Sequence, residues 1–140
     1  MKVGRACLAG IVGTAVMTLL MLALPHLGLP RLAIGEMLGT VFSLTVGYTG
    51  VGPAAGWIIH GIFGVVLACL YAAAVVGRLS GSPVARGLIY GVILFVMAQL
   101  VFMPLAGAGI FSRGDLHMLV GSLLGHLVYG GLVGSIYGLP

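Results

Sequence analysis

Long apolar stretches dominate this sequence, and short clusters of glycine, proline and charged residues separate them. An α-helix needs roughly 20 apolar residues to cross a hydrocarbon core of about 30 Å. Four segments meet this requirement, and we expect each to be a membrane-spanning helix. They cover residues 6–29, 53–77, 84–108 and 115–138. The pattern therefore predicts an all-α, polytopic membrane protein that forms one domain over residues 1–140.

The connection between the first two predicted spans, residues 30–52, differs from the other connections. It is too long for a simple turn and too apolar to lie free in water. Non-helical or short helical segments of this kind lie at the membrane interface or dip into it where protein covers them. We predict an outer interfacial or partly re-entrant segment, with Arg31, Glu36 and Tyr48 towards water or lipid headgroups.

The few cationic residues predict an orientation, because lysine and arginine accumulate at the cytoplasmic ends of membrane helices. With the N-terminus inside, the outer side receives two of them, Arg31 and Arg113. The inner side then receives Lys2, Arg5, Arg78 and Arg86. We therefore predict that both chain ends lie in the cytoplasm and that the protein is a multi-pass component of the inner (plasma) membrane.

Composition supports a membrane location and limits the possible partners. The chain is 61% hydrophobic and 6% charged, with a net charge of +4 and a mean hydropathy of +1.27. A water-soluble domain of this size needs far more polar surface. The charges are spread singly, so we expect no nucleic-acid partner; the expected partners are the lipid bilayer and other membrane subunits or a second copy. Cys7 and Cys69 stand alone in apolar stretches and are interpreted as small packing residues.

The second and fourth predicted spans share the pattern His-x-x-aromatic-Gly-x6-Tyr. Their matching residues are His60, Gly64 and Tyr71 in the second span and His126, Gly130 and Tyr137 in the fourth. At this spacing the three residues of each span lie on one helix face. The pattern predicts two tandem helical hairpins, related as parallel repeats by an axis along the membrane normal. The alternative is chance similarity between glycine-rich apolar segments.

An ionisable residue inside a membrane span is a candidate functional residue, because its burial is unfavourable. The repeat places His60 and His126 at similar depth on facing helices. Two neutral imidazoles in this arrangement can ligate the iron of a tetrapyrrole from both sides, so we predict a b-type haem between them. A chlorin held by one of the histidines is a variant. The alternative is that each histidine only hydrogen-bonds a neighbouring helix.

Four further residues complete this predicted cofactor site. Gly64 and Gly130 lie one turn from the histidines and are expected to leave room for a flat macrocycle. Arg31 and Arg113 lie on the outer side and are expected to neutralise haem propionates.

Other polar residues are weaker candidates. Gln99 is the one amide within the third span and is predicted to hydrogen-bond between helices, or to support a histidine. The methionines of the first and third spans suit core packing, or a soft-metal pathway as the alternative. An outer metal site is a further hypothesis, which no ligand spacing supports, and interface-seeking side chains are the alternative. Its candidate ligands are His26, Glu36, Asp115 and His117.

Four sequence segments resemble those of small, uncharacterised four-helix inner-membrane proteins of bacteria and archaea. They are AGIVGTAVMTLLM, GWIIHGIFG, MPLAGAG and GHLVYGGLVGSIYG. The resemblance implies a fold and a compartment, and it implies no activity.

Three classes of function follow from the sequence. The first is an accessory or structural subunit of a larger membrane complex, for example a respiratory one, with or without a bound tetrapyrrole. The second is a bis-histidine haem protein that transfers electrons. The third is a transporter or channel for a small solute or metal, formed by an oligomer. No paired carboxylates, phosphate-binding loop or nucleophile elbow occur within the spans, so we expect no enzyme activity from the chain alone.

Overall fold

A computed structural model describes residues 1–47 and 52–138, and within these residues it contains helices and no strands. The prediction for Tyr48 falls outside the described residues. The elements are α1 (Val3–Ala23), η1 (Leu24–Leu27), α2 (Ile34–Val46), α3 (Pro53–Leu70), η2 (Tyr71–Val75), α4 (Pro83–Met97), η3 (Ala98–Phe102), α5 (Met103–Leu105), η4 (Ile110–Gly114) and α6 (Leu116–Tyr137). The η2 and η3 segments are π-helical continuations of α3 and α4.

Four continuous helices are long and apolar enough to cross a membrane, which confirms the predicted all-helical fold with four long apolar helices. They are Val3–Leu27, Pro53–Val75, Pro83–Leu105 and Leu116–Tyr137. The first ends slightly earlier than predicted because Gly28 adopts a left-handed conformation, with φ of 81°. The third ends at Leu105, shortly before Gly107, whose φ is 82°. A glycine in this conformation terminates a helix without the steric penalty that a side chain would bring.

Two helices begin at side chains that cap them. Ser82 accepts a hydrogen bond of 3.2 Å from the Ala85 amide, and Pro83 follows at the first helical position of α4. Asp115 accepts bonds of 3.0 and 3.2 Å from the amides of His117 and Met118 at the start of α6. These caps satisfy amide groups that have no partner within the helix.

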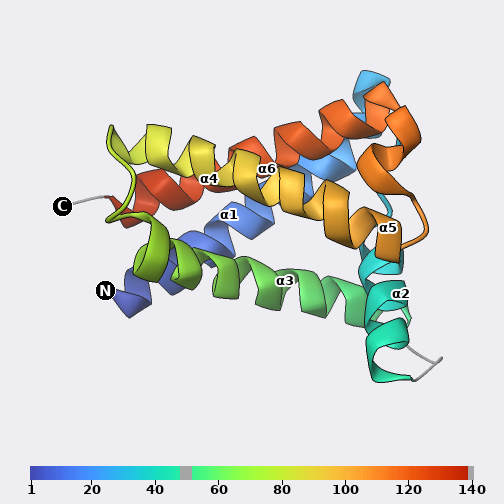
Figure 1. Ribbon diagram of the computed structural model, residues 1–140, viewed down its shortest axis with the longest axis horizontal. Coiled ribbons are helices and arrows are strands. Elements are labelled where there is room, and N and C mark those ends of the chain that lie inside the picture. The colour runs from blue at the N-terminus through green and yellow to red at the C-terminus, as the bar shows by residue number, and fades with distance from the viewer. Residues whose placement is uncertain (48–51, 139–140) are drawn as a thin grey trace.

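The long connection between the first two spans contains an additional helix, α2, which is apolar and 13 residues long. This is too short to cross a membrane. In Figure 1, α2 runs across the end of the bundle rather than along it, and it packs against α3. A side chain at Gly56 of α3 would collide with the backbone of Gly35 in α2, so glycine at this crossing allows the two helices to touch.

The four long helices form an open arrangement. α1 packs against α3 and α6, and α6 packs against α4. α3 and α4 follow one another in sequence, yet no extended packing joins them within the described residues. Figure 1 shows both termini and the 78–82 turn at one end, called here the terminal end, and α2 and α5 at the other, called the α2 end. The helices therefore follow the spatial order α3, α1, α6, α4, with a seam between α3 and α4.

Glycines set the close approaches within this bundle. A Cβ atom at Gly10 of α1 would lie 2.7 Å from the Val65 Cα atom of α3. A Cβ atom at Gly87 of α4 would collide with the Gly130 carbonyl of α6. Small residues allow helix backbones to approach in this way in membranes, where van der Waals packing replaces the hydrophobic effect between helices.

Candidate functional site: a cavity between the four spans

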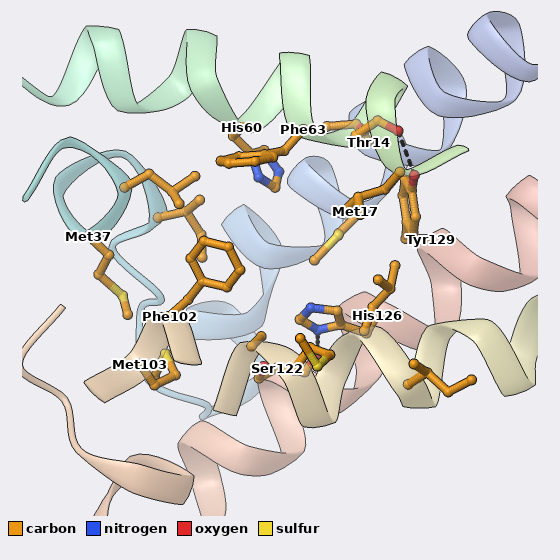
Figure 2. A pocket seen from close by; sticks show the side chains of 18 of the residues that line it. Thr14, Met17, Met37, His60, Phe63, Phe102, Met103, Ser122, His126 and Tyr129 are labelled. Carbon is orange, nitrogen blue, oxygen red and sulfur yellow. Dashed lines mark hydrogen bonds between the residues drawn. The ribbon is translucent and has the colours of Figure 1, made fainter. Parts of the chain in front are cut away.

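A cavity of about 490 Å³ lies between the four long helices. Its lining is overwhelmingly apolar, and two histidines from different helices are among the few polar residues (Figure 2). Met17 of α1 and Tyr129 of α6 line the cavity and are buried, whereas Ile93 and Met97 of α4 line it and are exposed. The cavity therefore opens along the seam between α3 and α4, where its mouth faces the surroundings of the bundle.

His60 of α3 brings an unsatisfied polar atom to this cavity. Its Nε2 atom is buried and has no hydrogen-bond partner within the described residues. The imidazole ring packs edge-on against Trp57, one turn earlier on the same helix, with 5.9 Å between ring centroids. A buried polar atom without a partner is unfavourable and suggests that a ligand completes the site.

His126 of α6 faces the same cavity from the opposite wall (Figure 2). Its Nδ1 atom lies 2.8 Å from the Ser122 carbonyl oxygen, one turn earlier. A carbonyl oxygen can only accept a hydrogen bond, so in the neutral ring Nδ1 carries the hydrogen. Nε2 then presents a lone pair, which can accept a hydrogen bond from a ligand or bind a metal ion.

Gln99 supports the helix that carries His126. Its side chain is fully buried at the start of η3, donates to the Ser122 hydroxyl at 3.1 Å and accepts from the Ser112 hydroxyl at 3.0 Å. The predicted interhelical role of Gln99 is therefore confirmed. Its connection to His126 is indirect, because Ser122 contacts Gln99 through its hydroxyl and His126 through its backbone carbonyl.

Sulfur and aromatic side chains form much of the cavity wall. Methionine is flexible and polarizable, and it packs well against aromatic rings, so such a wall suits a flat ligand. The lining methionines come from α1, α2, α4 and α5, and are Met17, Met21, Met37, Met97 and Met103. Phe63 and Phe102 also line the cavity, and their rings contact each other edge-on with 5.8 Å between centroids.

The structure places Gly64 and Gly130, the two predicted cofactor glycines, at contacts between helices. The position where a Gly64 side chain would lie is occupied by Thr14 of α1, and the corresponding position at Gly130 is occupied by the α4 backbone at Gly87 and Gly91. Both glycines therefore allow close helix packing, and Gly64 also lines the cavity.

The two arginines predicted to neutralise propionates lie outside the cavity lining. Neither Arg31 nor Arg113 is among the residues that line the cavity. The Arg31 guanidinium lies 3.2 Å from the Glu36 carboxylate, and Arg113 donates to the Gly107 carbonyl at 3.3 Å. Both side chains thus already have partners outside the cavity.

The outer residues proposed as metal ligands do not assemble into a site. No group of three or more histidine, cysteine, aspartate or glutamate side chains in the described part of the chain could hold a metal ion. Glu36 pairs with Arg31, and Asp115 serves as the cap of α6. The Nδ1 atom of His117 lies 3.9 Å from the Oδ1 atom of Asp115, and both side chains are exposed.

Three contacts were not predicted from the sequence. The Tyr90 hydroxyl of α4 donates to the Leu67 carbonyl at 2.8 Å, and the Tyr129 hydroxyl of α6 donates to the Gly64 carbonyl at 2.5 Å. Both bonds reach α3 and fix the wall that carries His60. Cys7 and Cys69, interpreted above as isolated packing residues, place their sulfur atoms 4.0 Å apart across the α1–α3 contact. The aromatic residue in the repeated His-x-x-aromatic motif was the available signal for Tyr129.

The fold and the cavity define a class: a small helical-bundle membrane protein with a lateral, histidine-containing cavity. Within that class, the chain belongs to DUF6789, a family of unknown function whose family model matches residues 1–139. Comparisons with curated proteins and with solved structures gave no match.

Proposed function

We propose that this protein is a small accessory subunit of a membrane complex, and that its cavity holds a flat, mostly apolar ligand in contact with His60 and His126. One observation carries this proposal: two imidazoles from separate helices present unpartnered or lone-pair nitrogens to a single apolar cavity of about 490 Å³. Ligand cavities in proteins commonly have this size and combine apolar walls with a few polar groups.

A tetrapyrrole is the first candidate ligand, and its metal would suit the donor set. The Nδ1–H bond of His126 to a backbone carbonyl fixes the tautomer in which Nε2 can ligate iron, and His60 offers an unpartnered Nε2. A bound haem would supply one-electron transfer, as in the electron carrier predicted above. His60 and His126 would then hold the metal, and the methionines and phenylalanines of the lining would pack against the macrocycle.

The negatively charged propionates of a haem are less compatible with this cavity than its iron is. Haem carries two propionates, and buried carboxylates need cationic or hydrogen-bonding partners. The cavity lining contains no lysine or arginine among the described residues, and Arg31 and Arg113 pair elsewhere. A tetrapyrrole would therefore have to place its propionates at the open seam.

Purification in mild detergent from the native membrane tests this proposal. The protein is expected to carry a stoichiometric, organic-extractable compound and to co-purify with other membrane subunits. A Soret band that disappears in His60→Ala and His126→Ala would identify a tetrapyrrole, with His117→Ala as a control outside the cavity. A lone monomer that yields no bound compound from native membranes would contradict both parts of the proposal.

We also propose that the terminal end of the bundle faces the cytoplasm and that the membrane is the inner membrane. Four of the six cationic residues lie at the terminal end, which favours this orientation. In a cysteine-free background, Ser80→Cys in the 78–82 turn should resist an impermeant maleimide applied to intact spheroplasts and react after lysis. Labelling before lysis would reverse the orientation.

The tandem-repeat hypothesis is supported by equivalent contacts in the two hairpins. Gly10 lies five residues after Arg5, and Gly91 lies five residues after Arg86, so the repeat makes these two glycines equivalent. Gly10 of α1 approaches Gly64 of α3, and Gly91 of α4 approaches Gly130 of α6. A symmetric pair of hairpins would also pack α3 on α4 as α1 packs on α6. The seam between α3 and α4 is open instead, and the cavity lies there. Gly10→Ala and Gly91→Ala should then destabilise the bundle to similar extents, and very different losses would count against the repeat.

A further inference from the structure

The opening of the cavity limits how a ligand can reach it. The seam between α3 and its neighbour is bridged at two points, by the Phe63–Phe102 ring contact and by the Tyr90 hydrogen bond to Leu67. Between these bridges on α4, Ile93 and Met97 line the cavity and are 47% and 50% exposed. Because this part of α4 belongs to a membrane span, the opening faces hydrocarbon. A ligand that enters here comes from the bilayer and is lipid-soluble.

The lining also limits the charge of the ligand. No aspartate, glutamate, lysine or arginine lines the cavity within the described part of the chain. A charged ligand group would lose its hydration without gaining a partner, which is strongly unfavourable. The ligand is therefore neutral where it contacts the protein. The volume of about 490 Å³ is also far larger than a single metal ion needs.

The two histidines specify the polar part of the ligand. Nε2 of His126 accepts hydrogen bonds, because Nδ1 holds the ring hydrogen in its bond to Ser122. A ligand that carries no metal must therefore present a hydrogen-bond donor to His126, and a hydroxyl group meets this requirement. Nε2 of His60 is buried and unpartnered on the opposite wall. A second hydroxyl can satisfy either tautomer of His60, because a hydroxyl both donates and accepts.

We propose that the cavity binds the reduced form of an isoprenoid quinone, with one ring hydroxyl donating to His126 and the other contacting His60. This inference rests on the proposed ligand-binding function and names the class of ligand. The flat ring lies among the phenylalanine and methionine side chains, and the isoprenoid tail leaves through the opening between α3 and α4 into the bilayer. No charged partner is required.

The geometry favours the quinol over the quinone. A quinone carbonyl only accepts hydrogen bonds, so it has nothing to offer the lone pair of a neutral His126. A quinol hydroxyl donates to that lone pair. One such hydrogen bond in an apolar site corresponds to about a tenfold difference in affinity. The oxidised form of the same molecule is therefore the matched comparison ligand.

The fluorescence of Trp57 can report ligand binding in the cavity. It is the single tryptophan of the chain, and its ring centroid lies 5.9 Å from that of His60. The full-length protein in phospholipid nanodiscs is titrated with decylubiquinol under nitrogen, and separately with decylubiquinone, while Trp57 fluorescence is recorded. The midpoint of each saturable change gives a Kd that does not depend on the depth of quenching. We expect the quinol to bind about tenfold more tightly.

Substitutions test whether His126 causes the preference for quinol over quinone. His126→Phe should abolish the difference between quinol and quinone, whereas His117→Phe, outside the cavity, should leave it unchanged. The wild-type comparison stands without the variant if His126→Phe fails to fold. Equal affinities, or tighter binding of the quinone, would overturn the quinol assignment.

The remaining outcomes separate this inference from the proposed function. No saturable change with either probe, together with a co-purified tetrapyrrole, would overturn the quinol assignment and leave the ligand-binding function in place. No saturable change and no co-purified compound from native membranes would overturn both.

Discussion

Tyr129 of α6 donates a hydrogen bond of 2.5 Å to the backbone carbonyl of Gly64 in α3, a residue that lies 65 positions earlier in the chain. The bond crosses the middle of the bundle between two helices that lack extended packing against each other. It ties the wall that carries His60 to the helix that carries His126. The cavity between the two histidines thus depends on a tyrosine that contacts neither of them by hydrogen bond.

Removal of the Tyr129 hydroxyl should therefore weaken the bundle. Tyr129→Phe keeps the ring and deletes the donor, and interhelical hydrogen bonds in membrane proteins contribute about 1 kcal/mol. We expect a loss of that size in the free energy of unfolding, measured by denaturant titration in mixed micelles. Tyr137→Phe is the matched control, because its hydroxyl accepts an exposed 3.3 Å bond from the Lys2 amide and bonds no other helix within the described residues. Equal losses in the two variants would contradict the assigned role.

Gly87 should tolerate no side chain. A methyl group there would collide with the Gly130 carbonyl of α6, and backbone cannot move aside as a flexible side chain can. Overpacking of this kind costs about 1–3 kcal/mol, so Gly87→Ala should lower the unfolding free energy by about 2 kcal/mol. Gly61→Ala is the control, since a methyl group at Gly61 meets nothing within 4 Å and alanine favours the helix. A Gly87→Ala protein as stable as Gly61→Ala would show that α4 and α6 do not approach closely here.

The spacing of residues along the sequence was sufficient to predict that the two histidines lie at one site. His60 and His126 each occupy a helix face that the spacing of their neighbours defines, and the structure places both faces on one cavity. Periodicity could not identify what fills the space beside Gly64 and Gly130, because that depends on which helix approaches each glycine. Thr14 fills the first position and the α4 backbone fills the second.

The cavity itself could not be predicted from local sequence. A short turn at residues 78–82 implies that α3 and α4 are antiparallel neighbours, and neighbours usually pack. Here α1 and α6 form the central contact, and the two neighbours remain apart along much of their length. Which pair of a four-helix bundle packs depends on contacts between residues far apart in sequence, such as Tyr129 with Gly64. No pattern within either span encodes that choice.

Gln99 should control the conformation of the turn before α6. Ser112 donates to Gln99 from a segment in which Phe111, Ser112 and Arg113 all have φ values between 45° and 53°. Side chains disfavour this conformation, so it needs support from its surroundings. Gln99→Leu leaves two buried hydroxyls without partners, and we expect a loss of about 1–3 kcal/mol.

Hydrogen exchange provides the local readout for Gln99→Leu. Amide exchange over residues 110–114 should accelerate more than exchange in the middle of α6. Ser135→Ala is the control, since the Ser135 hydroxyl donates to the Gly131 carbonyl of its own helix. Unchanged exchange at 110–114 in Gln99→Leu would show that another contact holds this turn.

The sulfur atoms of Cys7 and Cys69 should join into a disulfide under mild oxidation. They lie 4.0 Å apart, and a disulfide requires about 2.05 Å, so a movement of about 2 Å closes the bond. Copper phenanthroline with dissolved oxygen removes two electrons and two protons from the thiol pair, and the intact mass should fall by two hydrogens. Cys69→Ser should show neither this mass change nor protection of Cys7 from alkylation.

Because Cys7 and Cys69 are 62 positions apart, the bond can form within one chain only if α1 and α3 pack in the register described here. Exclusively intermolecular dimers would place the two helices elsewhere and would remove the framework that brings Thr14 against Gly64 and His60 into the cavity.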